Sequence, residues 1–190
     1  DERNPYSVSL GRQSPVWSIG IRNNQGFAYD TLTKKLYGSS HGPYSDDEIN
    51  VIERGKNYGH PIVIGYAADG NVNGTTAGGA MYDGNTSYRH PSSCPVITDE
   101  VAAALGIGPT YKDPFFSAYP GSPSFPTITS IWAANPLPGN GNWPSEGWSG
   151  LDIYNHTLIP GWKRSLVASS LKWGRLVRIK IDESGENPFY

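Results

Sequence analysis

Residues 26–40 read GFAYDTLTKKLYGSS, and this stretch predicts a β-hairpin. Its two ends have the short, apolar-rich character of strands, and the polar residues 31–35 between them suit a connecting loop. A second stretch repeats the pattern, because GLDIY at residues 150–154 is followed by a turn and then by SLVASS at residues 165–170. Each unit starts with Gly and ends on a Ser-Ser pair, so the chain contains two similar strand–turn–strand units.

The rest of the chain adds short strand signals and one long irregular segment. Residues 48–52 and 175–181 alternate polar and apolar side chains, as strands with one buried face do, and residues 16–21 alternate loosely. Residues 69–142 are crowded with Gly, Pro, Asn and Ser, and we expect them to be irregular apart from a helical turn or two at 101–105. Repeated hairpins around an insertion suggest the blades of an all-β propeller, although the pattern alone favours a β-sandwich or another all-β fold.

Composition excludes several classes of protein. The net charge is −2 and no basic tract occurs, so nothing would neutralise a row of nucleic-acid phosphates. The longest apolar runs fall far short of the ~20 residues that a membrane-spanning helix needs. Cys94 is the sole cysteine, so the chain has no internal disulfide. Six Trp and twelve Tyr supply too much surface to bury for a disordered chain.

The stretch HGPYSDDEIN at residues 41–50 is the densest candidate for chemistry. A Gly-Pro turn exposes backbone carbonyls and three acids follow it, which together are the oxygen ligands that calcium prefers; a solvated acidic turn is the plainer alternative. Arg22 and Asn23 precede the first hairpin and could hydrogen-bond a polyol or a planar acidic cofactor, although an ordinary turn would use the same residues. His41 follows the first Ser-Ser pair and Lys172 closely follows the second, so both could face a shared site.

Three motifs, taken in order, resemble one known family. They are IRNNQG at residues 21–26, HGP running into DEIN at residues 41–50, and NYGHP at residues 57–61. This order is similar to the HRNPQG, Gly-Pro with Asp-Glu-x-Asn, and NYGWP motifs of the soluble glucose and aldose sugar dehydrogenases that use pyrroloquinoline quinone (PQQ). Residues 161–181 resemble the family's next blade, whereas residues 69–142 match poorly.

The resemblance implies a six-bladed β-propeller of which residues 1–190 form only a part. We expect blade-like hairpins near residues 16–66 and 143–182, with residues 69–142 as a long irregular insertion. The family's general base, a His, would lie upstream of this stretch, and its Arg-x-Arg pair for the PQQ carboxylates would lie downstream. We therefore expect the whole protein to be the enzyme and this stretch alone to be inactive.

The resemblance also implies the chemistry, which is oxidation of the anomeric carbon of an aldose by hydride transfer to PQQ, assisted by calcium. The implied calcium ligands are the backbone carbonyls of Gly42 and Pro43. Arg22 and Asn23 are implied to act beside the quinone. His41 and Lys172 are implied to contact the cofactor, and Trp143 to line the substrate mouth.

A second, structural calcium site is implied at Glu48 and the carbonyl of Tyr58. The acidic partner expected after Tyr66 is displaced in this sequence, so that Asp69 is the nearest candidate. Asp99 or Glu100 could supply another ligand.

Three residues depart from the family's motifs, and they keep other functions open. Ile21, Asn24 and His60 replace the usual His, Pro and Trp. The alternative is a catalytically inactive propeller relative that serves as a carbohydrate-binding or interaction module; a purely structural calcium-binding β-domain is a third hypothesis. The enzyme hypothesis implies a periplasmic or secreted protein with an aldose substrate. Unpaired strand edges would favour a homodimer or association with the rest of the propeller.

Overall fold

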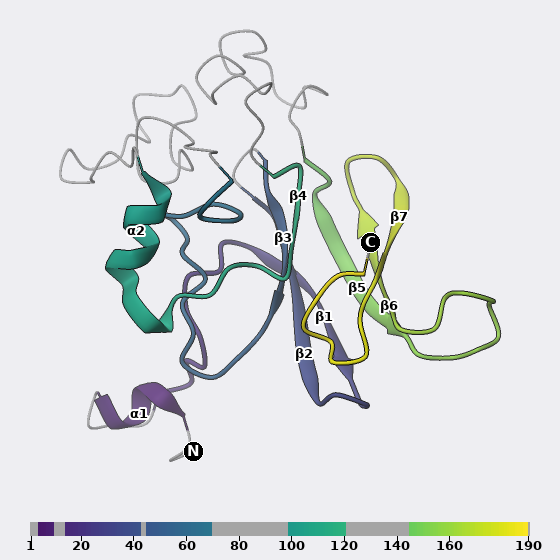
Figure 1. Cartoon of the computed structure of the whole chain (residues 1–190), viewed down its shortest axis with the longest axis horizontal. Helices are drawn as coiled ribbons and strands as arrows, with labels where there is room; N and C mark the ends of the chain where they lie inside the picture. The colour runs from purple at the N-terminus through teal and green to yellow at the C-terminus, as the bar shows by residue number, and fades with distance from the viewer. Residues whose placement is uncertain (1–3, 10–13, 43–44, 70–98, 121–144, 190) are drawn as a thin grey trace, which may run out of the picture.

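Two antiparallel sheets form the body of the chain (Figure 1). The computed structural model describes residues 4–9, 14–42, 45–69, 99–120 and 145–189. The first sheet has the order β1 (Asn24–Asp30), β2 (Lys35–Ser40), β3 (Asp47–Val51) and β4 (Phe116–Ala118). The second has the order β5 (Trp148–Tyr154), β6 (Ser165–Ser170) and β7 (Arg175–Lys180). Both are simple meanders, as blades of a propeller are.

The predicted hairpins are confirmed in position, and the structure gives their register. In the first, β1 and β2 pair from Asn24 opposite Ser40 to Asp30 opposite Lys35. In the second, β5 and β6 pair from Trp148 opposite Ser170 to Tyr154 opposite Ser165. Since each Ser-Ser pair ends the second strand of its hairpin, the residues that follow the two pairs leave equivalent ends of the two sheets.

The two sheets contact each other through β1 and β5. Strand β1 turns its small residues, Gly26 and Ala28, inward and leaves Phe27 and Tyr29 more than half exposed. A Cβ atom on Gly26 would lie 2.6 Å from the backbone nitrogen of Leu151, so glycine is what allows the two backbones to approach. The close approach of these two strands brings one sheet against the next.

A single apolar core fills the space between the sheets. Its fully buried side chains include Trp148 from β5, Leu166 from β6, and Tyr37 and Ile49 from the first sheet. Tyr37 also packs edge-on against Phe115, with ring centroids 5.6 Å apart. Because the core draws on both sheets, neither sheet buries its apolar face alone.

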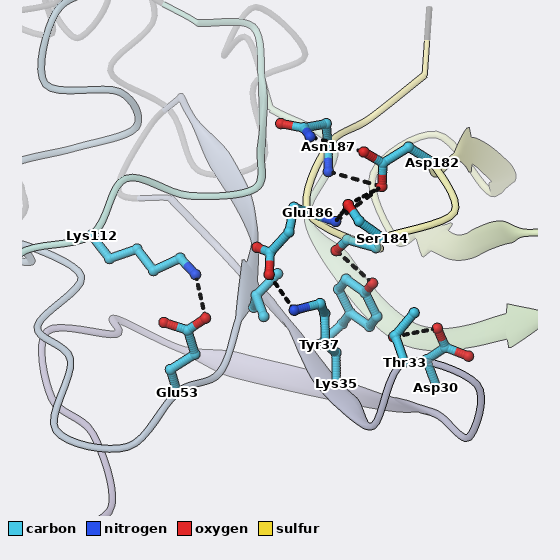
Figure 2. Close-up of polar contacts among 12 residues, drawn as sticks. Asp30, Thr33, Lys35, Tyr37, Glu53, Lys112, Asp182, Ser184, Glu186 and Asn187 are labelled. Carbon is cyan, nitrogen blue, oxygen red and sulfur yellow. Dashed lines mark hydrogen bonds and ion pairs between the residues drawn. The ribbon is translucent and has the colours of Figure 1, made fainter.

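Polar contacts also join the sheets. Asp30, at the end of β1, is fully buried and pairs with the buried Arg164 before β6 at 2.5 Å. The hydroxyl of Tyr37 donates to the carbonyl of Gly185 at 2.8 Å, and Lys35 forms an ion pair with Glu186 (Figure 2). These contacts fix the loop that follows β7 against the first hairpin.

The remaining elements lie beside the first sheet. They are the short helix α1 (Pro5–Ser9), helix α2 (Glu100–Ile107) and the 3₁₀ turn η3 (Gly108–Thr110). Helix α2 confirms the helical turns expected at residues 101–105, and Asp99 caps it by accepting a hydrogen bond from Ala102 N at 3.0 Å. Within the described ranges no helix is long and apolar enough to span a bilayer.

Two segments differ from the sequence-based expectation. Residues 16–21 form no strand; they make one isolated bridge, between Ile19 and Asn57, and bond to residues 55–58, with Ile19 N donating to the carbonyl of Lys56 at 3.0 Å. Strand β4 lies inside the segment expected to be irregular, and it completes the first sheet by pairing Phe116 with Ile49. Both differences arise from pairing with distant parts of the chain, which local alternation does not report.

Candidate functional site

The end of β2 gathers the first candidate residues. The amide of His41 donates to the carbonyl of Asn23 at 3.0 Å, and the amide of Asn23 donates to the hydroxyl of Ser40 at 3.1 Å. The side chain of Asn23 is held in turn, because Gln25 Nε2 donates to its Oδ1 at 2.7 Å. Asn23 and His41 therefore lie next to each other in an arrangement set by the first hairpin.

The residue that follows, Gly42, occupies a tight turn. A Cβ atom there would lie 1.7 Å from the carbonyl oxygen of Ser45 and 2.7 Å from that of Asp46. The turn therefore folds back on itself so closely that only glycine fits. Carbonyl-rich turns of this kind offer oxygen ligands to a hard cation. Pro43, its predicted partner in calcium binding, lies outside the described residues.

Two buried polar atoms beside the turn lack hydrogen-bond partners among the residues that the structure describes. They are Nε2 of His41 and Oδ1 of Asn24. A buried polar atom without a partner costs about 1–3 kcal/mol, so each one calls for an explanation, and a bound group is one explanation. The His41 ring nitrogen is thus suited to a polar group of a ligand.

Lys172 comes to the site from the second sheet. It follows β6, and its amide donates to the carbonyl of Glu146 at 3.1 Å. Its Nζ lies 5.1 Å from the ring centroid of Trp173, within the range of a cation–π contact. Burial lowers the pKa of Lys172, while the charges of Asp47 and Glu146 act in the opposite direction. The ammonium is thus partly desolvated, which strengthens its interaction with an anionic ligand.

Asp47 joins the two halves of this region. Its Oδ1 accepts the amide of Gly42 at 3.2 Å, and its Oδ2 accepts the amide of Glu146 at 2.6 Å. The Glu146 carboxylate is held by Tyr119, which donates its hydroxyl at 2.8 Å, and by an ion pair with Arg175. In the sequence Asp47 is visible only as one of three successive acids, and no motif marks Glu146.

Arg22, which directly precedes Asn23 in the chain, lies near His60. The amide of His60 donates to the carbonyl of Gly20 at 3.0 Å, which brings the NYGHP motif beside the segment that carries Arg22. Burial and, to a smaller extent, the charge of Arg22 lower the pKa of His60 to about 4. His60 is consequently neutral at pH 7 and adds no second positive charge beside Arg22.

The predicted structural calcium site at Glu48 and Tyr58 has fewer of its expected features than the site around Gly42. Glu48 is buried, and its Oε1 accepts the amide of Gly65 at 3.1 Å while its Oε2 accepts Asn50 Nδ2 at 3.0 Å. Burial raises the pKa of Glu48 to about 8, and burial likewise raises the pKa of Glu100 to about 8. Tyr58 is buried, and its hydroxyl donates to the carbonyl of Val51 at 2.5 Å.

The geometry around Glu48 does not yet amount to a metal site. The charges of Asp69, Asp46 and Glu48 all act on Glu100, so four acids share this region. Among the described residues, however, no group of three or more His, Cys, Asp or Glu side chains is arranged to hold a metal ion. The second calcium site therefore stays a prediction.

The structure brings four of the predicted site residues into one region. Asn23 precedes β1, His41 and Gly42 follow the end of β2, and Lys172 follows the equivalent end of β6. Trp143, the predicted substrate-mouth residue, lies outside the described ranges. One pocket of the chain lies at the opposite ends of β6 and β7, and its lining includes Lys163, Arg164, Lys180 and Phe189.

The chain matches a known family over the part that holds these motifs. The model of the glucose/sorbosone dehydrogenase family matches residues 1–98. Quinoprotein glucose dehydrogenase B of Acinetobacter calcoaceticus is 32% identical over 184 residues, which cover 90% of this chain and 36% of that protein. Aldose sugar dehydrogenase YliI of Escherichia coli is 44% identical over 59 residues, covering 31% of this chain and 16% of that protein.

Solved structures of similar proteins share the fold. A crystal structure of a glucose dehydrogenase superposes with a TM-score of 0.61 and 24% identity, covering all of this chain and 40% of the other. The soluble aldose sugar dehydrogenase of Escherichia coli in its apo form superposes with a TM-score of 0.60, 24% identity and the same coverage. These proteins are β-propellers, so the predicted fold class is confirmed and the chain covers part of a propeller. It spans about a third of the length of the first of the relatives above.

Proposed function

This chain belongs to the glucose/sorbosone dehydrogenase family, and from that premise we propose that it forms part of a PQQ- and calcium-dependent sugar dehydrogenase. The whole enzyme would oxidise the anomeric carbon of an aldose, and it would act in the periplasm or outside the cell. The observation that supports the proposal most is the shared position of His41, Gly42 and Lys172. They leave equivalent ends of two stacked sheets, and Asp47 connects the two ends through hydrogen bonds.

The residues fit an acidic, planar cofactor with a bound cation. The tight turn at Gly42 would present its carbonyl, together with that of Pro43, to calcium. The partly desolvated ammonium of Lys172 would bind an anionic group of the cofactor, and Nε2 of His41 would bind another polar group. Trp143 would line the substrate mouth.

When bound, PQQ would accept the hydride of the sugar while calcium polarises the quinone. Arg22 and Asn23 would stabilise negative charge beside the reacting oxygen, because a guanidinium and a side-chain amide are hydrogen-bond donors. The hydrogen bond from Gln25 Nε2 to Asn23 Oδ1 holds that side-chain amide, and the bond from the backbone amide of Asn23 to the Ser40 hydroxyl holds its backbone. Because His60 is neutral, Arg22 is the cation of this pair.

Calorimetric titration of PQQ tests the proposal on the 190-residue chain, in calcium and in chelator. We expect calcium-dependent binding that Lys172→Ala weakens about tenfold or more, since a hydrogen bond to a charged group contributes about 1.5–3 kcal/mol. Lys163→Ala is the matched control, because Lys163 is exposed and lies before β6, at the far end from Lys172. It should leave binding unchanged.

The same titration can reject the proposal. A folded chain that binds no PQQ with calcium would contradict a cofactor site formed by these residues alone, and equal binding in chelator would contradict the calcium ligands. Binding of an aldose without PQQ would instead favour the carbohydrate-binding alternative. Thermal unfolding measured beside each titration shows whether the variant is folded.

A further inference from the structure

Asp47 spans the two sheets at the candidate site. It begins β3, its side chain is fully buried, and its two carboxylate oxygens accept the amides of Gly42 and Glu146. Glu146 is 99 residues away in sequence and precedes the first strand of the second sheet. We propose that Asp47 is a positioning residue that holds the Gly42 turn and the Lys172 segment in fixed relation to each other. The inference rests on the function proposed above.

A continuous chain of hydrogen bonds leads from Asp47 through Glu146 to Lys172. The carbonyl of Glu146 accepts the amide of Lys172 at 3.1 Å and the hydroxyl of Ser170 at 2.8 Å. The neighbouring amide of Leu171 donates to the carbonyl of Gly147 at 3.0 Å. The backbone of Glu146 is thus hydrogen-bonded to Asp47 through its amide and to the residues at the end of β6 through its carbonyl. Displacing it would displace the backbone that carries Lys172.

Aspartate is the residue type that this arrangement needs. Two backbone amides converge on one side chain, and an ionised carboxylate accepts both with charge-assisted hydrogen bonds. Asn offers a single acceptor oxygen and would set its NH₂ group against one of the amides. Apolar residues would leave both amides without partners. The negative charge of Asp47 also favours the charged form of Lys172.

Backbone hydrogen exchange followed by NMR tests the link without any cofactor. In the unmutated chain the amides of Gly42 and Glu146 lie outside the strands, yet we expect them to exchange as slowly as amides of β3. In Asp47→Asn at least one of them should exchange about tenfold faster or more, and so should the amide of Lys172.

Asp30→Asn is the matched control. Asp30 is also fully buried and also accepts several hydrogen bonds, but it lies at the other end of the hairpin from His41. It should lower the midpoint of thermal unfolding while the amides of Gly42, Glu146 and Lys172 keep their unmutated rates. With PQQ and calcium, Asp47→Asn should weaken binding about 10- to 100-fold, the usual effect of losing a residue that supports a ligand, and Asp30→Asn should weaken it far less.

The outcomes separate the two proposals. If the unmutated chain fails to bind PQQ, these 190 residues do not form a working cofactor site by themselves, and the exchange rates still decide the role of Asp47. If the Gly42 and Glu146 amides of the unmutated chain exchange as fast as the exposed Gly161, the link is absent, whether or not Asp47→Asn folds. Equal loss of PQQ binding in Asp47→Asn and Asp30→Asn would reduce Asp47 to an ordinary contributor to stability.

Discussion

Gly42 leaves no room for a side chain at the point where the candidate site begins. Its α-carbon faces the carbonyl oxygens of Ser45 and Asp46, which belong to backbone and cannot swing aside as a flexible side chain would. Any larger residue must therefore open the turn, and the opened turn would carry its carbonyl away from the position it now has. The amide that Gly42 donates to Asp47 would move with it.

We predict that Gly42→Ala destabilises the chain and removes calcium-dependent PQQ binding. Overpacking of this kind costs about 1–3 kcal/mol, and the loss should appear as a lower urea midpoint. Gly106→Ala is the control, because Gly106 lies in helix α2 with open space around it. That variant should be more stable by about 0.5–1 kcal/mol and should bind PQQ normally. An unchanged urea midpoint and unchanged binding in Gly42→Ala would refute the account of the turn.

At the scale of a single element, strand β3 supplies one residue to each candidate site. Its five residues are all buried between β2 and β4. Successive side chains of a strand point to opposite faces, so Asp47 and Glu48 diverge. Asp47 reaches the amides of Gly42 and Glu146, whereas Glu48 meets the amide of Gly65, whose neighbour Ile64 donates its amide to Glu100 at 3.2 Å.

The two buried glutamates predict how stability depends on pH. Burial raises the pKa of Glu48 and of Glu100 from 4.5 to about 8. The folded chain thus keeps protons that the unfolded chain releases, so stability falls as pH rises from about 4.5 through 8. In chelator the midpoint of thermal unfolding should be higher at pH 6 than at pH 8.5, and Glu48→Gln should flatten the difference.

Calcium should oppose this loss if the second site forms. A cation stabilises the ionised carboxylates, so calcium should raise the unfolding midpoint more at pH 8.5 than at pH 6. Glu53→Gln is the control, because Glu53 is paired with Lys112 near the surface and should leave the calcium effect intact. A calcium effect that survives Glu48→Gln would exclude Glu48 as a ligand.

At the scale of the whole molecule, the described strands leave apolar surface uncovered. Phe27 is 60% exposed and Tyr29 is 52% exposed on β1, which ends the strand order of its sheet. On the second sheet, Leu171 and Leu176 are exposed around the turn from β6 to β7. Apolar strands at a sheet edge favour pairing with another chain or another part of the same protein.

We predict that the 190-residue chain self-associates in a concentration-dependent way. Replacing Phe27 by Ser and Tyr29 by Lys together should shift the population toward monomer in analytical ultracentrifugation, because it removes apolar surface and adds charge at the edge. Leu105→Ser is the control, since Leu105 is an exposed apolar residue of helix α2, remote from the sheet edge. Equal shifts in both variants would mean that β1 is not the interface.

The sequence alone determined the hairpins and the family. Strand alternation, the polar loop and the Ser-Ser endings are local, so they placed β1, β2, β5, β6 and β7 to within about two residues. The three ordered motifs pointed to the sugar dehydrogenase family because each is a short stretch of adjacent residues that can be recognised without the structure. Helix α2 was visible for the same reason, since its Ala-rich segment follows the capping Asp99.

Only the tertiary structure decided which distant residues meet. Strand β4 has three residues and becomes a strand because β3 offers it a partner, while residues 16–21 alternate loosely and yet join no sheet. The bond from Glu146 to Asp47 spans 99 residues and that from Arg164 to Asp30 spans 134. Such contacts depend on how the two sheets stack, and stacking is set by the shared core and by the close approach at Gly26. No window of sequence carries that information, because each partner looks ordinary in its own neighbourhood.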